Sequence, residues 1–179
     1  MKIPVVFAAI CFSVAAGQPQ TAAPAAHPSP PDRVDACALL ADAEIQTTLG
    51  ETVKARTPSS APAGGGLQLN QCHFGTDGTH DVSLAVAASP GGASLSPRQY
   101  WRQQFHPPAG QTGSSKPAIL AIAGVGDEAY WAGGAIAGAL YALRGDAFIR
   151  VSVGGIKSET ARIEKSKALA LAALDRLQK

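Results

Sequence analysis

Apolar and polar residues alternate with a period of two along several stretches of this chain. In the stretch 82–88, branched apolar residues alternate with serine and alanine, and the stretch 147–153 alternates around Ile149 and Val151. This alternation is typical of half-buried strands. Each stretch follows another apolar segment across a turn, Gly75–Thr79 in the first case and Gly145-Asp146 in the second. The pattern therefore predicts two β-hairpins, 69–74 with 82–88 and 137–144 with 147–153.

Three other stretches have apolar residues at helical spacing. The first runs from Asp35 to Leu49, with a break near Ala41, and Gly50 is placed as a C-terminal glycine. The second begins at Ser96-Pro97, a cap followed by proline, and runs to about Phe105 with Trp101 in the core. The third is capped by Ser158. Its predicted core stripe consists of Ile163, Ala170, Leu171, Leu174 and Leu177.

Short strands are predicted at 51–55 and 118–123, which gives about six strands in total. Segments 57–66 and 89–96 are loops by their proline and glycine content. The order is helix, strands, helix, strands, helix, and hairpins join the strands. We therefore expect one α+β domain over 34–179, with a mainly antiparallel sheet and helices packed on it as an α/β/α sandwich.

Residues 1–17 have the pattern of a secretory signal peptide, with Lys2, a short apolar stretch and small residues near positions 16 and 17, where we expect cleavage. The apolar stretch is too short to cross a hydrocarbon core of roughly 30 Å. Lipid attachment at Cys11 is disfavoured because no small residue directly precedes it. Residues 18–33 are rich in proline and alanine and predict a disordered linker. The expected location is the periplasm or the medium.

The loss of Lys2 leaves 14 basic residues against 13 acidic ones. Nucleic acids and anionic membranes attract clustered basic residues, and the chain has no such cluster. We therefore expect no nucleic-acid binding and no stable membrane insertion, but a monomer with a ligand or protein partner in the envelope or outside the cell.

Two cysteines, Cys37 and Cys72, remain once Cys11 is removed with the signal. An even number in an oxidising compartment favours a disulfide. Two buried thiols and a metal site are the alternatives. A metal site is disfavoured because the adjacent residues Cys72 and His73 face opposite sides of a strand, so that His73 and His80 do not complete a ligand set.

Three segments together resemble one family. They are Asp35-x-Cys37-x-Leu39-Leu40-x-x-x-Glu44-Ile45-x-x-x-Leu49-Gly50, Cys72-His73-Phe74, and Gly124-x-Gly126-Asp127-Glu128-Ala129-Tyr130. With the closing helix, these segments resemble the DUF3558-type bacterial lipoproteins and secreted proteins, grouped with the PsbP-like/Mog1 fold. The resemblance implies a sheet between helices, a Cys37–Cys72 disulfide and no common catalytic residues. Ala41 departs from the family's Ser or Thr, and no lipid-anchoring cysteine follows the signal.

Catalytic motifs are missing from the sequence. No Gly-x-Ser-x-Gly elbow occurs, and Asp77, His80 and Asp81 belong to a hairpin turn. We therefore expect neither an enzyme nor a cofactor, but a non-catalytic binding or accessory module. A hydrolase-like enzyme and a secreted inhibitor or structural component are the alternatives.

The segment Gly124-Val125-Gly126 predicts a backbone turn rather than a phosphate loop, because no later glycine and no long helix follow. The candidate ligand-contact residues are Asp127, Tyr130 and Trp131, since aromatic faces beside an acid can hold a sugar or a cation.

Overall fold

A computed structural model describes residues 34–89, 93–107 and 119–177. The predicted signal peptide (1–17), the predicted linker (18–33) and most of the region between the second helix and 118–123 lie outside these residues. Within them, no helix is long and apolar enough to span a membrane.

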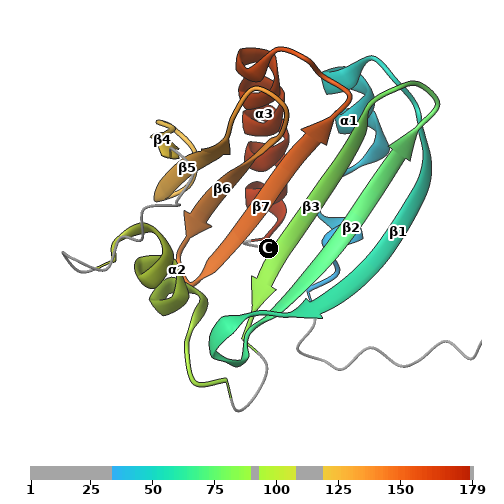
Figure 1. Ribbon diagram of the computed structural model, residues 1–179. Helices are drawn as coiled ribbons and strands as arrows, with labels where there is room; N and C mark the ends of the chain where they lie inside the picture. Colours follow the sequence, from blue (N-terminus) through green and yellow to red (C-terminus); the bar gives the residue numbers. More distant parts are fainter. Residues whose placement is uncertain (1–33, 90–92, 108–118, 178–179) are drawn as a thin grey trace, which may run out of the picture.

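One seven-stranded sheet forms the centre of the domain (Figure 1). Every neighbouring pair of strands is antiparallel, and their spatial order is β1-β2-β3-β7-β6-β5-β4. The strands are β1 (Val53–Pro62), β2 (Gln68–Thr76), β3 (Asp81–Ala88), β4 (Ile119–Ala121), β5 (Glu128–Gly133), β6 (Gly138–Arg144) and β7 (Ala147–Gly154). The α+β class is confirmed, as are both hairpins, β2–β3 and β6–β7.

The sheet has seven strands where the sequence predicts about six. The additional strand is β5, whose flanking glycines indicate a loop at the sequence level. The short strand predicted at 51–55 exists but is longer, since β1 begins at Val53 and continues through Pro58 to Pro62, so the loop prediction for 57–66 was wrong over 57–62. Strand β1 lies at the edge of the sheet. Proline, which has no N–H group, is tolerated there because the outer side of an edge strand has no partner strand to donate to.

Two helices and a short 3-10 helix cover one face of the sheet. They are η1 (Ala36–Ala38), α1 (Asp42–Leu49) and α3 (Glu159–Leu177). The predicted break near Ala41 is confirmed, and Gly50 ends α1 with a φ of 79°. Figure 1 shows α1 and α3 behind the sheet as viewed. Arg176 of α3 donates to Glu44 of α1 over 2.7 Å, which ties the two helices together.

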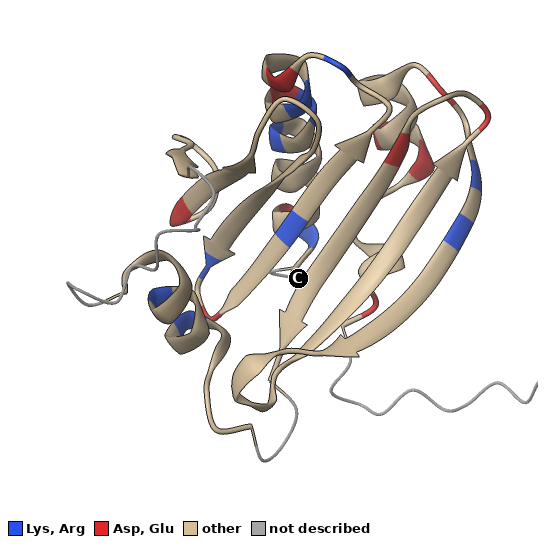
Figure 2. Cartoon of the chain, viewed as in Figure 1, with Lys and Arg blue, Asp and Glu red and all other residues tan. Residues whose placement is uncertain are grey.

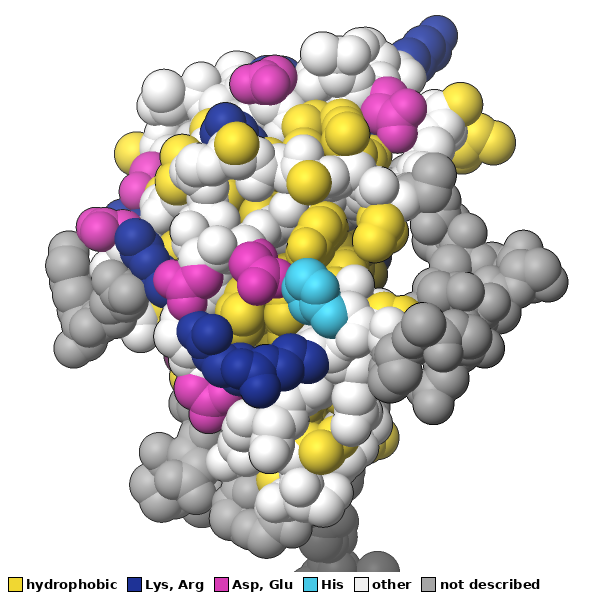
Figure 3. Space-filling view, turned by 90° about the vertical axis from the view of Figure 1, so that its left-hand side faces the viewer, with side chains coloured by type: hydrophobic (Ala, Val, Ile, Leu, Met, Phe, Trp, Pro, Cys, Tyr) yellow, Lys and Arg dark blue, Asp and Glu magenta, His cyan; other side chains and the backbone are white. Residues whose placement is uncertain are grey.

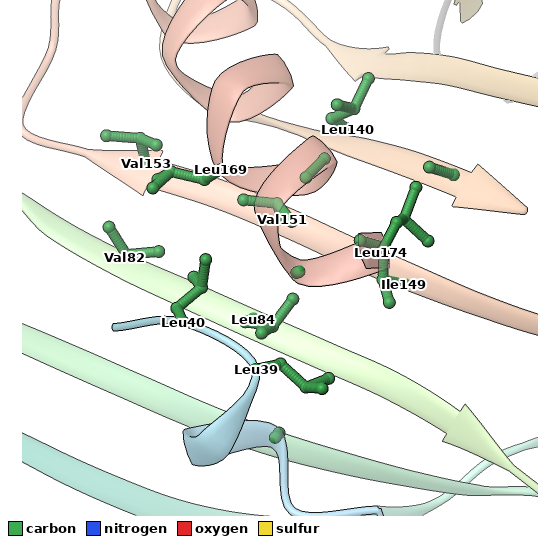
Figure 4. Close-up of a cluster of buried hydrophobic side chains, with 14 of the residues drawn as sticks. Leu39, Leu40, Val82, Leu84, Leu140, Ile149, Val151, Val153, Leu169 and Leu174 are labelled. Carbon is green, nitrogen blue, oxygen red and sulfur yellow. The ribbon is translucent and has the colours of Figure 1, made fainter. Parts of the chain in front are cut away.

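The main core lies between these helices and the sheet. Leucine, isoleucine and valine side chains from β3, β6 and β7 meet Leu169 and Leu174 of α3, with Leu39 and Leu40 beside them (Figure 4). The predicted stripe of α3 is wrong at Leu171, which is 43% exposed, and Leu169 is buried in its place. Residues 166, 169, 170, 173 and 174 are all buried, a spacing that follows one face of a helix and leaves position 171 outside.

Helix α2 (Pro97–Phe105) packs on the opposite face and covers only one end of it. Its cap is as predicted, with Ser96 Oγ accepting from the N–H of Gln99 over 3.3 Å. Trp101 is fully buried, and its ring centroid lies 4.2 Å from that of Phe105 and 5.9 Å from that of Phe148 on β7. The helices therefore cover the central strands on one face and only one end of the sheet on the other.

A disulfide joins Cys37 in η1 to Cys72 in β2, with 5.0 Å between their Cα atoms. Cys72 is completely buried. The bridge fixes the N-terminal end of the described chain to the centre of β2 and closes a loop with a sequence separation of 35.

Reduction of this disulfide is expected to lower the free energy of unfolding by about 3–4 kcal/mol. The reason is that a cross-link closing a loop of this length reduces the conformational entropy of the unfolded chain by an amount that corresponds to this free energy. Denaturant unfolding of the wild-type protein with and without a phosphine reductant measures the change. The variant Cys37→Ala/Cys72→Ala is the control, because the reductant has no bond to break in it. Two alkylated thiols in unreduced protein would contradict the bridge.

Candidate functional site

The three residues that the sequence nominates for ligand contact do not share one surface. Tyr130 and Trp131 are neighbours on β5 and point to opposite faces of the sheet. Tyr130 stacks on Phe105 of α2, with ring centroids 5.0 Å apart. Trp131 is 2% exposed on the helix-covered face, and its indole N–H donates to Glu159 over 2.9 Å. The pattern of the sequence does not reveal this separation because β5 was not recognised as a strand.

Asp127 connects α2 to the β6–β7 turn. Its Oδ2 accepts from Arg98 over 2.7 Å and from the backbone N–H of Gly145 over 2.9 Å. Arg98 also donates to the carbonyl of Gly145 over 2.7 Å. Figure 3 shows this side of the molecule, with acidic and basic side chains close together above apolar ones. Asp127 thus has cationic and backbone partners within the protein.

The glycines before Asp127 form a backbone turn, and a strand follows them rather than a helix. Gly124 and Gly126 have φ values of 77° and 60°. A Cβ at Gly126 would lie 2.2 Å from the carbonyl oxygen of Leu143, whereas a Cβ at Gly124 would meet nothing within 4 Å. The chain therefore passes directly against β6 at Gly126, as a backbone turn requires.

Two histidine–carboxylate pairs are candidates for acid–base chemistry. His80 Nδ1 lies 2.6 Å from Glu51, and His106 Nε2 lies 2.7 Å from Glu128. Thr76 donates to Glu51 over 2.5 Å, and with the N–H groups of His80 and Thr79 it lowers the pKa of this carboxyl to about 2.

The hydrogen bond from His106 lowers the pKa of Glu128, and a second from Trp101, over 2.9 Å, acts in the same direction. A carboxylate whose pKa is lowered is a weak general base at neutral pH. Among the described residues, no serine or cysteine side chain hydrogen-bonds to a histidine, and no group of three or more possible metal ligands occurs. The His80–Glu51 pair joins the β2–β3 turn to the segment before β1, and the His106–Glu128 pair joins the end of α2 to β5.

The part of the sheet that α2 leaves uncovered is built from small and polar side chains. Its residues lie in cross-strand rows because the register places partners on the same face. One row consists of Ser59, Gln71, Ala85, Arg150 and Tyr141, and the next of Thr57, His73, Ser83 and Ser152. Across β3, β6 and β7 this face carries two charged side chains, Asp81 and Arg150.

A groove of about 370 Å³ lies over β6 and β7 on this face. Arg150 and Tyr141 line one side of the groove, Asp81 lines another, and Ser152 and Ala139 form its floor. Figure 2 shows a single basic position on β7, which is Arg150, the only basic residue of that strand. Two other grooves, of about 330 and 300 Å³, contain no arginine or lysine.

Arg162 of α3 also lines the groove. It is 2% exposed, and its guanidinium donates to the carbonyls of Ala135, Ile136 and Ile156 over 2.9–3.2 Å and to that of Gly134 over 2.5 Å. These bonds fix the β5–β6 loop to the start of α3. The loop presents Ile136, which is 94% exposed, at the edge of the groove.

Sequence reasoning did not identify the groove residues. The alternation along 147–153 puts Arg150 on the face opposite Ile149, as the structure has it, but nothing in the spacing pairs Arg150 with Tyr141. A charged residue in the middle of an otherwise apolar strand is the signal that could have singled it out. Arg162 has no comparable signal, because an arginine in the first turn of a helix is ordinarily exposed.

Comparisons of the chain with models of protein families, with curated proteins and with solved structures find no match in any of the three.

Substitution of the two turn glycines by alanine is expected to have unequal effects. Gly124→Ala costs roughly 1–2 kcal/mol of unfolding free energy because of its positive φ alone. Gly126→Ala costs roughly 1–3 kcal/mol more, because its Cβ also collides with the Leu143 carbonyl. Denaturant unfolding of both variants measures the difference, and equal costs would contradict the close approach at Gly126.

The pKa of Glu51 predicts a dependence of stability on acid. The pKa of the Glu51 carboxyl is about 2 in the folded protein and near its ordinary value of 4.5 in the unfolded chain. The stabilisation by ionised Glu51 is therefore complete above pH 4.5 and is lost as the pH falls to about 2. Glu51→Gln should be less stable than wild type at neutral pH, with a difference that disappears over this window. Glu164→Gln, at an exposed position of α3, is the control. A difference that persists at the acidic end would contradict the assignment.

Proposed function

We propose that this protein is a non-catalytic binding module that acts outside the cytoplasm, and that the uncovered face of its sheet is its binding surface. The observation that carries the proposal is the groove over β6 and β7, where Arg150, Tyr141, Ser152 and Asp81 converge on one space. Its volume, about 370 Å³, lies in the range of small-molecule sites, which combine a few polar groups with apolar walls.

The location outside the cytoplasm is supported by two independent features. The chain begins with the pattern of a signal peptide, and a disulfide joins its two remaining cysteines. Disulfides persist in oxidising compartments and are rare in the cytosol. We also propose that the protein belongs with the DUF3558-type secreted proteins and the PsbP-like fold. The position of the Cys37–Cys72 bridge and an antiparallel sheet with helices on both faces support this assignment.

A binding role fits the site better than catalysis does. The carboxylates that pair with histidines have lowered pKa values, and both cysteines are oxidised. Within the described residues, the polar groups that face the groove include neither a histidine nor a thiol. Such a site can hold a ligand through charge and hydrogen bonds, but it supplies no nucleophile with an adjacent base.

Native mass spectrometry of the protein, purified from the cells that naturally express it, tests this function. The wild-type protein should retain a small molecule, and Ser152→Trp should lose it, because the indole would fill the floor of the groove. Thr57→Trp is the matched control, since Thr57 lies on the same face and in the same row, three strands or about 14 Å away.

Retention of the molecule by Thr57→Trp but not by Ser152→Trp supports the groove as the binding surface. A wild-type protein that retains no small molecule, or equal retention in both variants, would contradict the groove as the binding surface. Thermal unfolding of both variants shows that any loss of ligand does not come from loss of the fold.

A further inference from the structure

The groove has an excess of positive charge. Two arginines, Arg150 and Arg162, line it together with one carboxylate, Asp81. Among the described residues, no carboxylate lies within 4 Å of either guanidinium. Asp81 lies opposite Gly154, four residues along β7 from Arg150, and its Oδ2 is 3.7 Å from Nδ1 of His73. The groove therefore attracts an anion more strongly than a cation.

Arg150 is placed to receive an anionic group. It lies in the middle of β7, where its cross-strand neighbours are Ala85 and Tyr141. Ala85 is small and buried, and on the other side the Tyr141 ring lies beside the guanidinium, with 6.0 Å from the ring centroid to Cζ. A half-buried guanidinium that no carboxylate engages can bind a carboxylate or phosphate through two parallel hydrogen bonds.

The guanidinium of Arg162 adds to the positive potential in the groove and has one N–H group without a hydrogen-bond partner. Four backbone carbonyls occupy the terminal nitrogens of Arg162, but its buried Nε–H has no hydrogen-bond partner. Its charge therefore lies in the lining of the groove, and no described carboxylate is within 4 Å of it. A cation in a poorly solvated place interacts with a nearby anion more strongly than one in water does.

Part of the groove is apolar. Ala132, Ala139 and Gly138 form a smooth strip along β5 and β6, and Ile136 stands beside it. Ile136 is 94% exposed, yet its loop is fixed by the bonds from Arg162, so its position does not depend on a partner. An exposed isoleucine on a fixed loop beside a cationic groove is a suitable contact for the apolar part of a ligand.

We infer that the groove binds a small organic anion, in which a carboxylate or phosphate held by Arg150 is attached to an apolar body that lies against Ile136 and the alanine strip. This inference rests on the proposed binding function and names the class of ligand. A carboxylate and a phosphate offer the same paired oxygens to a guanidinium, so the two sources are separated by experiment.

Four probes of similar shape test the inference, namely benzoate, phenyl phosphate, the neutral benzyl alcohol and the cationic benzylamine. Each is titrated into the 15N-labelled protein, and the backbone amide shifts of residues 136–141 and 150–155 are followed by NMR. Benzoate or phenyl phosphate should move these amides at the lowest concentration, and the stronger of the two identifies the preferred anion. Benzyl alcohol should bind more weakly, and benzylamine should bind most weakly.

Arg150→Gln should weaken binding of the anions roughly tenfold or more, because the charge-assisted hydrogen bonds are lost. Arg150→Lys keeps the charge without the fork and should give a smaller loss. Arg102→Gln, at an exposed position of α2, removes the same charge elsewhere and should leave binding unchanged. The amide spectra of all three variants show directly that they are folded.

The inference is overturned if Arg150→Gln binds the anions as tightly as the wild type does, or if benzylamine or benzyl alcohol binds at least as well as benzoate and phenyl phosphate. In those cases shifts confined to the groove would still support the binding function. If none of the four probes moves the groove amides, the inference fails, and the retention experiment with Ser152→Trp decides separately whether the groove binds another kind of ligand.

Discussion

Burial of α3 on one face of the sheet is the interaction on which the rest of this structure depends. The helix places Leu169, Ala170, Ala173 and Leu174 against the branched residues of β3, β6 and β7, and these four side chains are buried. Because side chains alternate along a strand, this contact fixes which half of each strand points inward. A slip of one residue would exchange Ile149 and Val151 for Arg150 and Ser152, so the register of the central strands has little freedom.

The same constraint determines the opposite face. Once the branched residues point toward α3, the face that remains carries Ser83, Ala85, Arg150 and Ser152, and α2 covers only the end where Phe148 and Tyr130 lie. Small side chains in adjacent rows leave a depression between larger neighbours. The groove over β6 and β7 is thus a consequence of one-sided packing. Arg150 lies in it because Ile149, the preceding residue of β7, points toward α3 and side chains alternate along a strand.

The sequence predicts those elements whose signals are local. Ser96-Pro97 starts α2, and the turn at Gly145-Asp146 joins β6 to β7, because a cap and a turn need only a few adjacent residues. Strand β1 is different, since its prolines are tolerated only at the edge of the sheet, a position that the chain order does not reveal. The groove could not be predicted for a related reason: Arg150, Asp81 and Arg162 come from separate elements and meet only through the strand order and the docking of α3.

Arg162 connects the core to the groove. A buried cation is costly unless polar groups surround it, and here four carbonyls of the β5–β6 loop and the β7–α3 segment supply them. A lysine ammonium carries its donors on one nitrogen, whereas the guanidinium of Arg162 uses two, Nη1 for Ala135, Ile136 and Ile156 and Nη2 for Gly134, so lysine would fit this place less well. The loop that carries Ile136 is therefore held by the helix that fills the core. The shape of the groove and the stability of the domain then depend on the same helix, so a ligand that contacts this loop binds a surface already formed before it arrives.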